Sequence, residues 1–249
     1  RVSSSAASDV YKRQDPENPA AKGSEDLTED NENKTTAEIS RSLRSPMLSF
    51  ANTDMAFKDN ILIAGSYHGF NIYELDDDGI PNLISSVVCP GGQGDVSIVG
   101  DLLIMSVEEN RSRLDCGLEG VNSDSSPERF RGIRIFDVSN LSKPKQVGAV
   151  QTCRGSHTHS VVSTTKDNKI IVYNSGTGRV RDNEEQAECF GWDGGGSSYF
   201  SIDVIEIPIN NPSDSRIVKS PKVFMDLETG NVAGLWRGGD HGDDTQDTN

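Results

Sequence analysis

Apolar and polar residues alternate in the same way in three short segments of the chain. The segments cover residues 69–75, 132–138 and 201–207 and read GFNIYEL, GIRIFDV and SIDVIEI. Each has apolar side chains at its second and fourth positions and ends in an acidic residue followed by an aliphatic one. A period of two places these side chains on one face of a β-strand. We therefore expect three equivalent strands with the same face apolar.

Further strand-like segments surround these three in a constant order. A short aliphatic segment precedes each one, namely NILIAG (60–65), DLLIMS (101–106) and KIIVYN (169–174). A proline-led segment follows the first two, at 81–88 and within 137–150. Two turns of similar sequence, CPGGQGDVSIV (89–99) and CRGSHTHSVV (153–162), each introduce a new unit. Four antiparallel strands copied along a chain predict the blades of a β-propeller.

We thus expect an all-β fold of consecutive four-stranded antiparallel blades that form a partial ring. A β-sandwich is the alternative, but the repeated four-strand order replaces the long crossing connections of a Greek key. Two polar insertions, residues 108–131 and 179–198, make the spacing of the units irregular. Insertions of this kind form loops on one rim of a repeat fold.

Composition agrees with a loop-rich β fold and excludes two classes of partner. Apolar residues make up 33% of the chain, and 24 residues are glycine, which does not suit a helical bundle. A formal charge of −15 repels nucleic-acid phosphates and anionic lipid surfaces. The chain also lacks the roughly 18 consecutive apolar residues that a transmembrane helix needs. We expect no nucleic-acid partner and no transmembrane segment in this chain.

The four cysteines fall into two pairs that are close in sequence, and neither pair has the CxxC spacing of metal ligands. We expect the disulfides Cys89–Cys116 and Cys153–Cys189, because each would anchor one polar excursion of the chain. Disulfides in turn indicate an oxidising compartment. The other two connectivities, and buried free thiols, are the alternatives.

The two ends of the chain read differently from its middle. Residues 1–45 are polar and without apolar periodicity, which predicts a disordered tail, and residues 1–14 (RVSSSAASDVYKRQ) resemble a translated adapter sequence. The last twelve residues, GGDHGDDTQDTN, form a Gly/Asp-rich loop with no strand after it. We expect residues 46–249 to be a partial propeller of about three to four blades, a fragment truncated at the C-terminus.

As a set, these segments resemble the LVIVD-repeat proteins, a family of exported bacterial and archaeal β-propellers. The resemblance runs from about residue 50 to the end of the chain. It is carried by NILIAG, DLLIMS, GIRIFDVSNLSKP (132–144), the two cysteine-containing turns and GLWRGGDHGDDTQ (234–246). The resemblance implies secretion or a surface location, together with further blades after residue 249. It brings no particular reaction to this chain.

Polar residues on an innermost blade strand face the central channel and are the first candidates for a site. His157 and His159 stand two apart, which places both imidazoles on one face of a strand, and Asp95 has the corresponding position in the preceding unit. Together they could bind a divalent metal such as Zn²⁺. The competing interpretation is that hydrogen-bonded polar residues merely fill the channel.

A second candidate metal site lies near the end of the chain. Asp240, His241 and Asp243 could clamp Ca²⁺ if the neighbouring glycines let the loop curl. The spacing lacks the ligand alternation of an EF-hand, so a solvated acidic loop is the competing interpretation. No cofactor other than a divalent metal, Ca²⁺ or Zn²⁺, is indicated.

Two functions follow from these patterns. The first is a noncatalytic propeller module, exported to the periplasm, the cell surface or the medium, that presents its loop-bearing rim to a protein or glycan. The second is a metal-dependent enzyme, a hydrolase or oxidoreductase, with its centre at the channel near His157 and His159. Nucleophilic catalysis has no support, because neither a GxSxG elbow nor a phosphate-binding loop is present.

Overall fold

The computed structural model describes residues 52–164, 167–191, 197–223 and 225–229, which form three four-stranded sheets. The first contains β1 (Asn52–Lys58), β2 (Ile61–Ser66), β3 (Gly69–Leu75) and β4 (Pro81–Val88). The second contains β5 (Val96–Val99), β6 (Leu102–Val107), β7 (Gly132–Asp137) and β8 (Lys145–Gln151). The third contains β9 (Thr158–Thr164), β10 (Lys169–Ser175), β11 (Asp203–Pro208) and β12 (Arg216–Lys219), with a short 3₁₀-helix, η4 (Pro212–Asp214), before β12.

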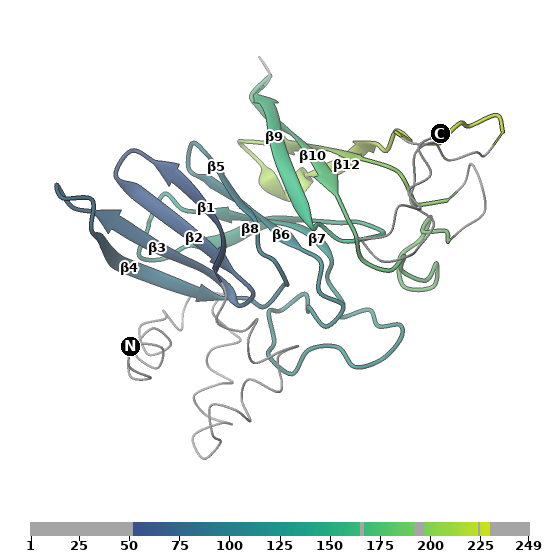
Figure 1. Cartoon of the computed structure of the whole chain (residues 1–249), viewed down its shortest axis with the longest axis horizontal. Helices are drawn as coiled ribbons and strands as arrows, with labels where there is room; N and C mark the ends of the chain where they lie inside the picture. The colour runs from purple at the N-terminus through teal and green to yellow at the C-terminus, as the bar shows by residue number, and fades with distance from the viewer. Residues whose placement is uncertain (1–51, 165–166, 192–196, 224, 230–249) are drawn as a thin grey trace, which may run out of the picture.

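In each sheet every strand pairs antiparallel with its neighbour in sequence. Three such sheets follow one another through the molecule (Figure 1). This is the architecture of consecutive propeller blades, so the predicted fold class is confirmed. Strands β3 and β4 have the predicted bounds. Strand β11 begins two residues later than predicted, because Ser201 instead forms an isolated bridge with Lys222.

The middle sheet is buried on both of its faces by the two outer sheets. Towards the first sheet, Leu103, Met105 and Phe136 pack with Ile63, Phe70 and Ile72, and the Phe70 and Phe136 ring centroids are 5.0 Å apart. Towards the third sheet, Ile104, Ile133 and Ile135 pack with Ile170, Val172, Ile205 and Ile207. All residues of β6 are therefore buried, and each buried aliphatic side chain contributes about 1.5–3 kcal/mol.

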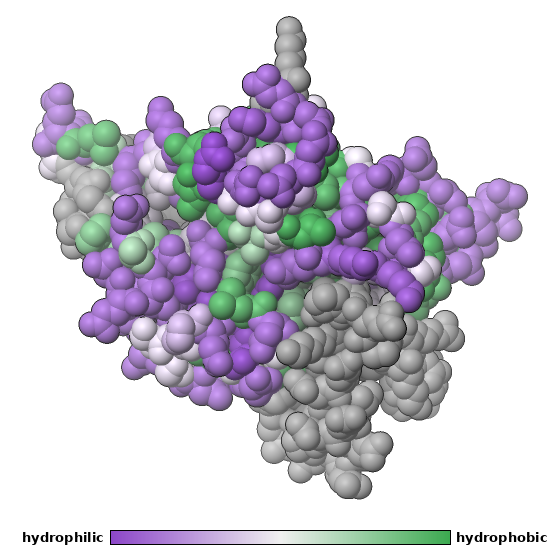
Figure 2. Space-filling view, turned by 180° about the vertical axis from the view of Figure 1, so that it is seen from behind, coloured by the Kyte–Doolittle hydropathy of each residue, from purple (hydrophilic) through white to green (hydrophobic). Residues whose placement is uncertain are grey.

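The outer sheets leave their far faces open. Met55 and Phe57 of β1 are 59% and 57% exposed, and Tyr173 of β10 is 44% exposed. In the described part of the chain the three sheets thus form part of a ring, as predicted. The face shown in Figure 2 is largely hydrophilic where it is coloured, with hydrophobic side chains in patches between polar ones. Within the described ranges, no helix has the length and apolar character that crossing a membrane requires.

The third strand of the first two blades starts with a glycine for the same steric reason. Gly69 and Gly132 have φ values of 141° and 147°, and a Cβ would lie 2.1 Å from the Val87 carbonyl oxygen and 1.9 Å from that of Val150. Only glycine adopts this conformation without strain, and only a missing side chain permits the close approach. The repeated glycine is thus a structural feature of the blade.

The antiparallel order decides which connections share a rim. The links β2–β3, β4–β5, β6–β7, β8–β9 and β10–β11 all leave the sheets at the same end. Both polar insertions belong to this set: residues 108–131 follow β6, and residues 179–198 lie between β10 and β11 (Figure 1). We call this end of the molecule the insertion rim. It collects loops from all three blades on one scaffold.

Candidate functional site

Two histidines of the third blade reach polar side chains of the second blade. His159 in β9 is buried, and its Nδ1 lies 2.8 Å from the hydroxyl oxygen of Ser106 in β6. His157, just before β9, is half-buried, and its Nδ1 lies 2.9 Å from Glu108 Oε2 at the start of the first insertion. Both imidazoles therefore face the second blade, with separate partners two residues apart.

Burial is the largest cause of the pKa shifts of His159 and Asp95. It lowers the pKa of His159 to about 4, so the imidazole is neutral at pH 7. Burial also raises the pKa of Asp95, and the carboxylates of Asp54 and Glu108 add to that shift. The Thr158 side chain and the charge of His157 act in the opposite direction. Asp95 therefore lies in the same neighbourhood as the two predicted histidines.

The proximity of His157, His159 and Asp95 does not by itself form a metal site. Among the residues that the structure describes, no three His, Cys, Asp or Glu side chains gather in a way that could hold a metal ion. Metal binding by His157, His159 and Asp95 stays a prediction. The second candidate group, Asp240, His241 and Asp243, lies outside the described residues.

The cysteine pairing is confirmed, with S–S distances of 2.06 Å for both Cys89–Cys116 and Cys153–Cys189. Cys116 lies in the first insertion and Cys189 in the second, while their partners lie in the β4–β5 and β8–β9 connections. Each disulfide therefore fastens one insertion to a neighbouring connection on the same rim. No free cysteine occurs among the described residues.

A buried carboxylate joins the two insertions to each other. Glu185 of the second insertion accepts hydrogen bonds from the guanidinium groups of Arg129 and Arg181 and, at 2.9 Å, from the backbone N–H of Ser126. The side chains of Glu185 and Arg181 are each 1% exposed. Arg131 adds a second link, because its guanidinium donates to the backbone oxygen of Arg179 at 2.7 Å. These contacts hold the two loops in one fixed arrangement.

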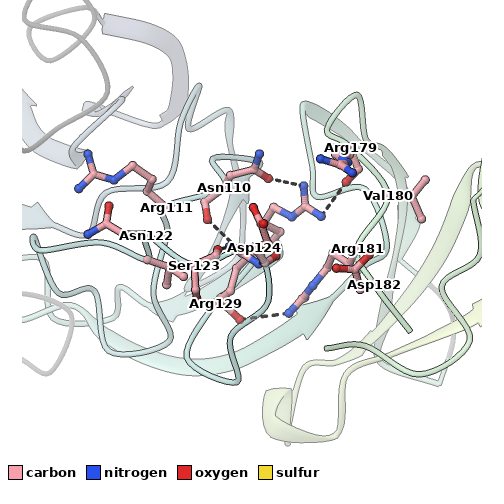
Figure 3. A pocket seen from close by; sticks show the side chains of 12 residues that line it. Asn110, Arg111, Asn122, Ser123, Asp124, Arg129, Arg179, Val180, Arg181 and Asp182 are labelled. Atoms are coloured by element: carbon pink, nitrogen blue, oxygen red, sulfur yellow. Dashed lines mark hydrogen bonds between the residues drawn. The ribbon is translucent and has the colours of Figure 1, made fainter. Parts of the chain in front are cut away.

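The joined insertions enclose a hollow of about 420 Å³. One wall comes from the first insertion and the opposite wall from residues 179–182 of the second (Figure 3). The lining residues are Asn110, Arg111, Val121, Asn122, Ser123, Asp124, Arg129, Arg131, Arg179, Val180, Arg181 and Asp182. We call this hollow the insertion pocket. It has the volume of a small-molecule site but a much more polar lining than most such sites.

The arginines of the insertion pocket differ in their hydrogen-bond acceptors, which are a carboxylate for some and neutral groups for others. Arg129 and Arg181 share the carboxylate of Glu185. Arg131 is almost fully buried, yet its hydrogen bonds go to neutral acceptors: the Asn110 side chain and the backbone oxygens of residues 153 and 179. Burial, and then the nearby charges of Arg181 and Arg129, lower the pKa of Arg131 to about 10. It remains charged at neutral pH.

Sequence reasoning missed this pocket, although the chain carries a signal for it. Arg-x-Arg pairs occur at 111–113, 129–131 and 179–181, and neither insertion contains a lysine. A guanidinium presents a planar fork of donors that suits fixed polar contacts better than an ammonium does. The net charge of −15 is a sum over the whole chain and does not reveal this local concentration of positive charge.

No protein-family model and no curated protein matches the chain. Solved structures to which it is similar include Saccharomyces cerevisiae Sqt1, with a TM-score of 0.43, 8% identity, and coverage of 70% of this chain and 36% of that one. Apo AztD from Citrobacter koseri gives a TM-score of 0.37, 8% identity, and coverage of 70% and 34%. The WD40 β-propeller domain of Doa1 gives 0.25, 9% identity, and coverage of 68% and 67%.

The chain thus spans about a third of the length of Sqt1 and AztD. At these TM-scores the likeness carries no weight in the fold assignment, which is based on the three sheets themselves.

Proposed function

We propose that the chain is an exported or cell-surface β-propeller module of the LVIVD-repeat type, without catalytic activity, that binds a protein or glycan through its insertion rim. The observation that carries this proposal is the construction of the rim. Two long loops are each fastened by a disulfide and are joined to each other through Glu185. Loops held by a rigid scaffold are a common place for binding residues.

Two further observations support the proposal. Structural disulfides persist mainly in oxidising compartments, which agrees with export. The insertion pocket lies between loops of two blades, so the sequences of the loops can change without altering the buried sheets.

The test is a binding screen of the 249-residue chain, with its disulfides intact, on arrays of immobilised neutral glycans, acidic glycans and peptides. The rim variant Asn122→Ala/Asp124→Ala changes two exposed pocket residues, and Asp77→Ala/Asp78→Ala is the matched control on the opposite rim. We expect at least one bound partner whose affinity falls about tenfold in the rim variant and not in the control. Absence of any partner, or a loss confined to the control, would contradict the proposal.

A metal-dependent enzyme is the second candidate, and one observation favours it. The buried Nε2 of His159 has no hydrogen-bond partner in the described part of the chain, and the carboxylate of Asp54 interacts electrostatically with this imidazole. Elemental analysis after purification without chelator tests this function. Stoichiometric metal that is lost in His157→Ala and His159→Ala supports the enzyme, whereas a folded, metal-free protein rules it out.

A further inference from the structure

The first blade carries a row of aromatic and aliphatic side chains across the whole width of its open face. Each of its four strands contributes one residue that pairs directly with the next across the sheet, in the order Phe57, Leu62, Tyr73 and Leu83. Residues paired in this way point to the same side of a sheet. Met55, two positions before Phe57 on the same strand, lies on that side as well. Both Met55 and Phe57 are more than half exposed.

The equivalent row of the second blade is buried in the contact between two blades. Leu103 has the position in DLLIMS that Leu62 has in NILIAG, and it pairs with Ile98 and Phe136 across the sheet. Leu103 and Phe136 are fully buried in the core shared with the first blade. The open face of the first blade is therefore the repeat equivalent of a face that packs against another blade. By repetition, the surface that fits it is the opposite face of a blade.

The third blade leaves such an opposite face open. Val172 of β10 packs towards the second blade, so the alternate residues Ile171 and Tyr173 point away from it. Val204 of β11 pairs with Tyr173 and lies on the same side. Tyr173 is 44% exposed, and none of the described sheets covers this face. The corresponding faces of the first and second blades are both buried against the blade that follows.

The charged groups on the open face of the third blade are compatible with a contact. The carboxylate of Glu206 accepts hydrogen bonds from Lys169 at 3.0 Å and from Arg216 at 2.9 Å, so its charge is already compensated. Arg216 and Lys219 belong to β12, the last strand of the sheet, and the last strand of a blade lies at the outer, hydrated edge of a propeller. The apolar side chains lie on the two central strands, β10 and β11.

We propose that two copies of the chain close one ring, in which the open face of the first blade of each copy packs against the open face of the third blade of the other. This contact continues the packing that already joins the blades within one chain. Two copies of three blades give six blades, within the range of roughly four to eight that propellers have. A head-to-tail contact closes into a ring when its rotation fits the number of copies.

The closed ring has a consequence for the insertion rim. The twofold axis that relates the copies is the axis of the ring, so both insertion rims face the same side. One dimer therefore presents two insertion pockets to the same surface, and a partner with repeated binding sites would gain avidity from engaging both. The inference itself concerns the open faces of the blades and does not depend on what the rim binds.

The experiment is sedimentation equilibrium of the 249-residue chain, with its disulfides intact, over a wide range of concentrations. We expect a monomer–dimer equilibrium whose larger species has twice the mass of one chain, 27.0 kDa. Phe57→Glu and Tyr173→Glu each place a charge in the contact, and each should raise the dimer dissociation constant at least about tenfold. Ile80→Glu is the matched control, because Ile80 is 58% exposed but lies in the turn between β3 and β4. All three side chains are exposed, and melting curves establish that the variants are folded.

A mixture of the two interface variants tests the head-to-tail geometry. The Phe57→Glu copy keeps an intact third blade and the Tyr173→Glu copy keeps an intact first blade, so the mixture retains one of the two contacts. We expect it to regain a dimer that is weaker than the wild type, although each variant alone is monomeric at the same concentration.

Three results would overturn the inference. Loss of the dimer in Phe57→Glu with no effect of Tyr173→Glu would mean that two first blades pack on each other. A wild-type chain that stays monomeric at every concentration would mean that no second copy covers these faces. Growth into open polymers would mean that the contact does not close a ring. A dimer that Ile80→Glu weakens as much as the two interface variants do would place the contact elsewhere and overturn the inference as well.

Discussion

Replacing Glu185 with glutamine removes a carboxylate that two buried arginines share. The Glu185 side chain is 1% exposed, Arg181 is 1% exposed and Arg129 is 8% exposed, so water compensates little of the loss. Removing one partner of a buried ion pair costs about 3–5 kcal/mol, because the remaining charge stays buried. Glutamine keeps one acceptor oxygen and nearly the same shape. The cost should therefore be at the low end, about 3 kcal/mol.

A loss of this size is easy to measure. In a domain of about 150–250 residues, 1 kcal/mol corresponds to about 2–4 °C in melting temperature. Glu185→Gln should therefore melt about 6–12 °C below the wild type at pH 7, in differential scanning calorimetry with the disulfides oxidised. Glu184→Gln is the matched control, since Glu184 is the neighbouring exposed glutamate, and it should melt within about 1 °C of the wild type.

The dependence on pH gives a second readout of the same contact. Burial opposes the charged form of Glu185, but the Ser126 N–H, the Arg181 hydrogen bond and the charges of Arg181 and Arg129 together outweigh it and lower its pKa. A group whose pKa is lower in the folded state stabilises the fold above its unfolded pKa of about 4.3 and loses that effect as pH falls further. The wild-type advantage over Glu185→Gln should therefore shrink below about pH 4. Equal melting temperatures of the two proteins at pH 7 would refute the assigned ion-pair geometry.

Three further predictions concern the scaffold. Removing either disulfide by a paired Cys→Ser change should cost about 3–4 kcal/mol on the loop-closure account, measured by urea unfolding; a cost near zero would mean that the insertions do not depend on their anchors. Burial lowers the pKa of His159 to about 4, so protonation of the unfolded chain should remove about 3 kcal/mol of stability as pH falls from about 6.5 to 4. His159→Gln should abolish that part of the pH dependence, and an unchanged profile would show that another group is responsible. Gly132→Ala, whose Cβ would lie 1.9 Å from the Val150 oxygen, should cost more than about 1 kcal/mol, while Gly191→Ala, with open space around its Cβ, should cost little; equal melting temperatures would contradict the steric argument.

The blade order could be predicted because each strand shows its own alternation of apolar and polar residues within a short segment of the sequence. The alternation in 69–75 and 132–138 fixed both the strands and the face that they bury. The cysteine pairing followed from sequence-local spacing and from the need of each polar excursion for an anchor. Strands β1 and β12 were not identified, because β1 has exposed Met55 and Phe57 and β12 has only four residues. Two large apolar residues in β1 and two in β12 are too few to establish an alternation like that of residues 69–75.

The insertion pocket could not be predicted, because it depends on contacts between residues far apart in sequence. Glu185 meets Arg129 and Ser126, which lie more than fifty positions earlier. The sequence around Glu185 is acidic and polar and does not show that its partners are Arg129 and Ser126. The Arg-x-Arg pairs were visible, but only the fold brings two insertions from neighbouring blades to the same rim.

The central claim is that the insertion rim is the binding face, and hydrogen–deuterium exchange with a saturating partner from the array screen tests it most directly. We expect slower exchange confined to peptides from residues 108–131 and 176–191, which line or border the insertion pocket. Slower exchange in the opposite-rim turns at residues 76–80 and 138–144, or no change anywhere in the chain, would contradict it.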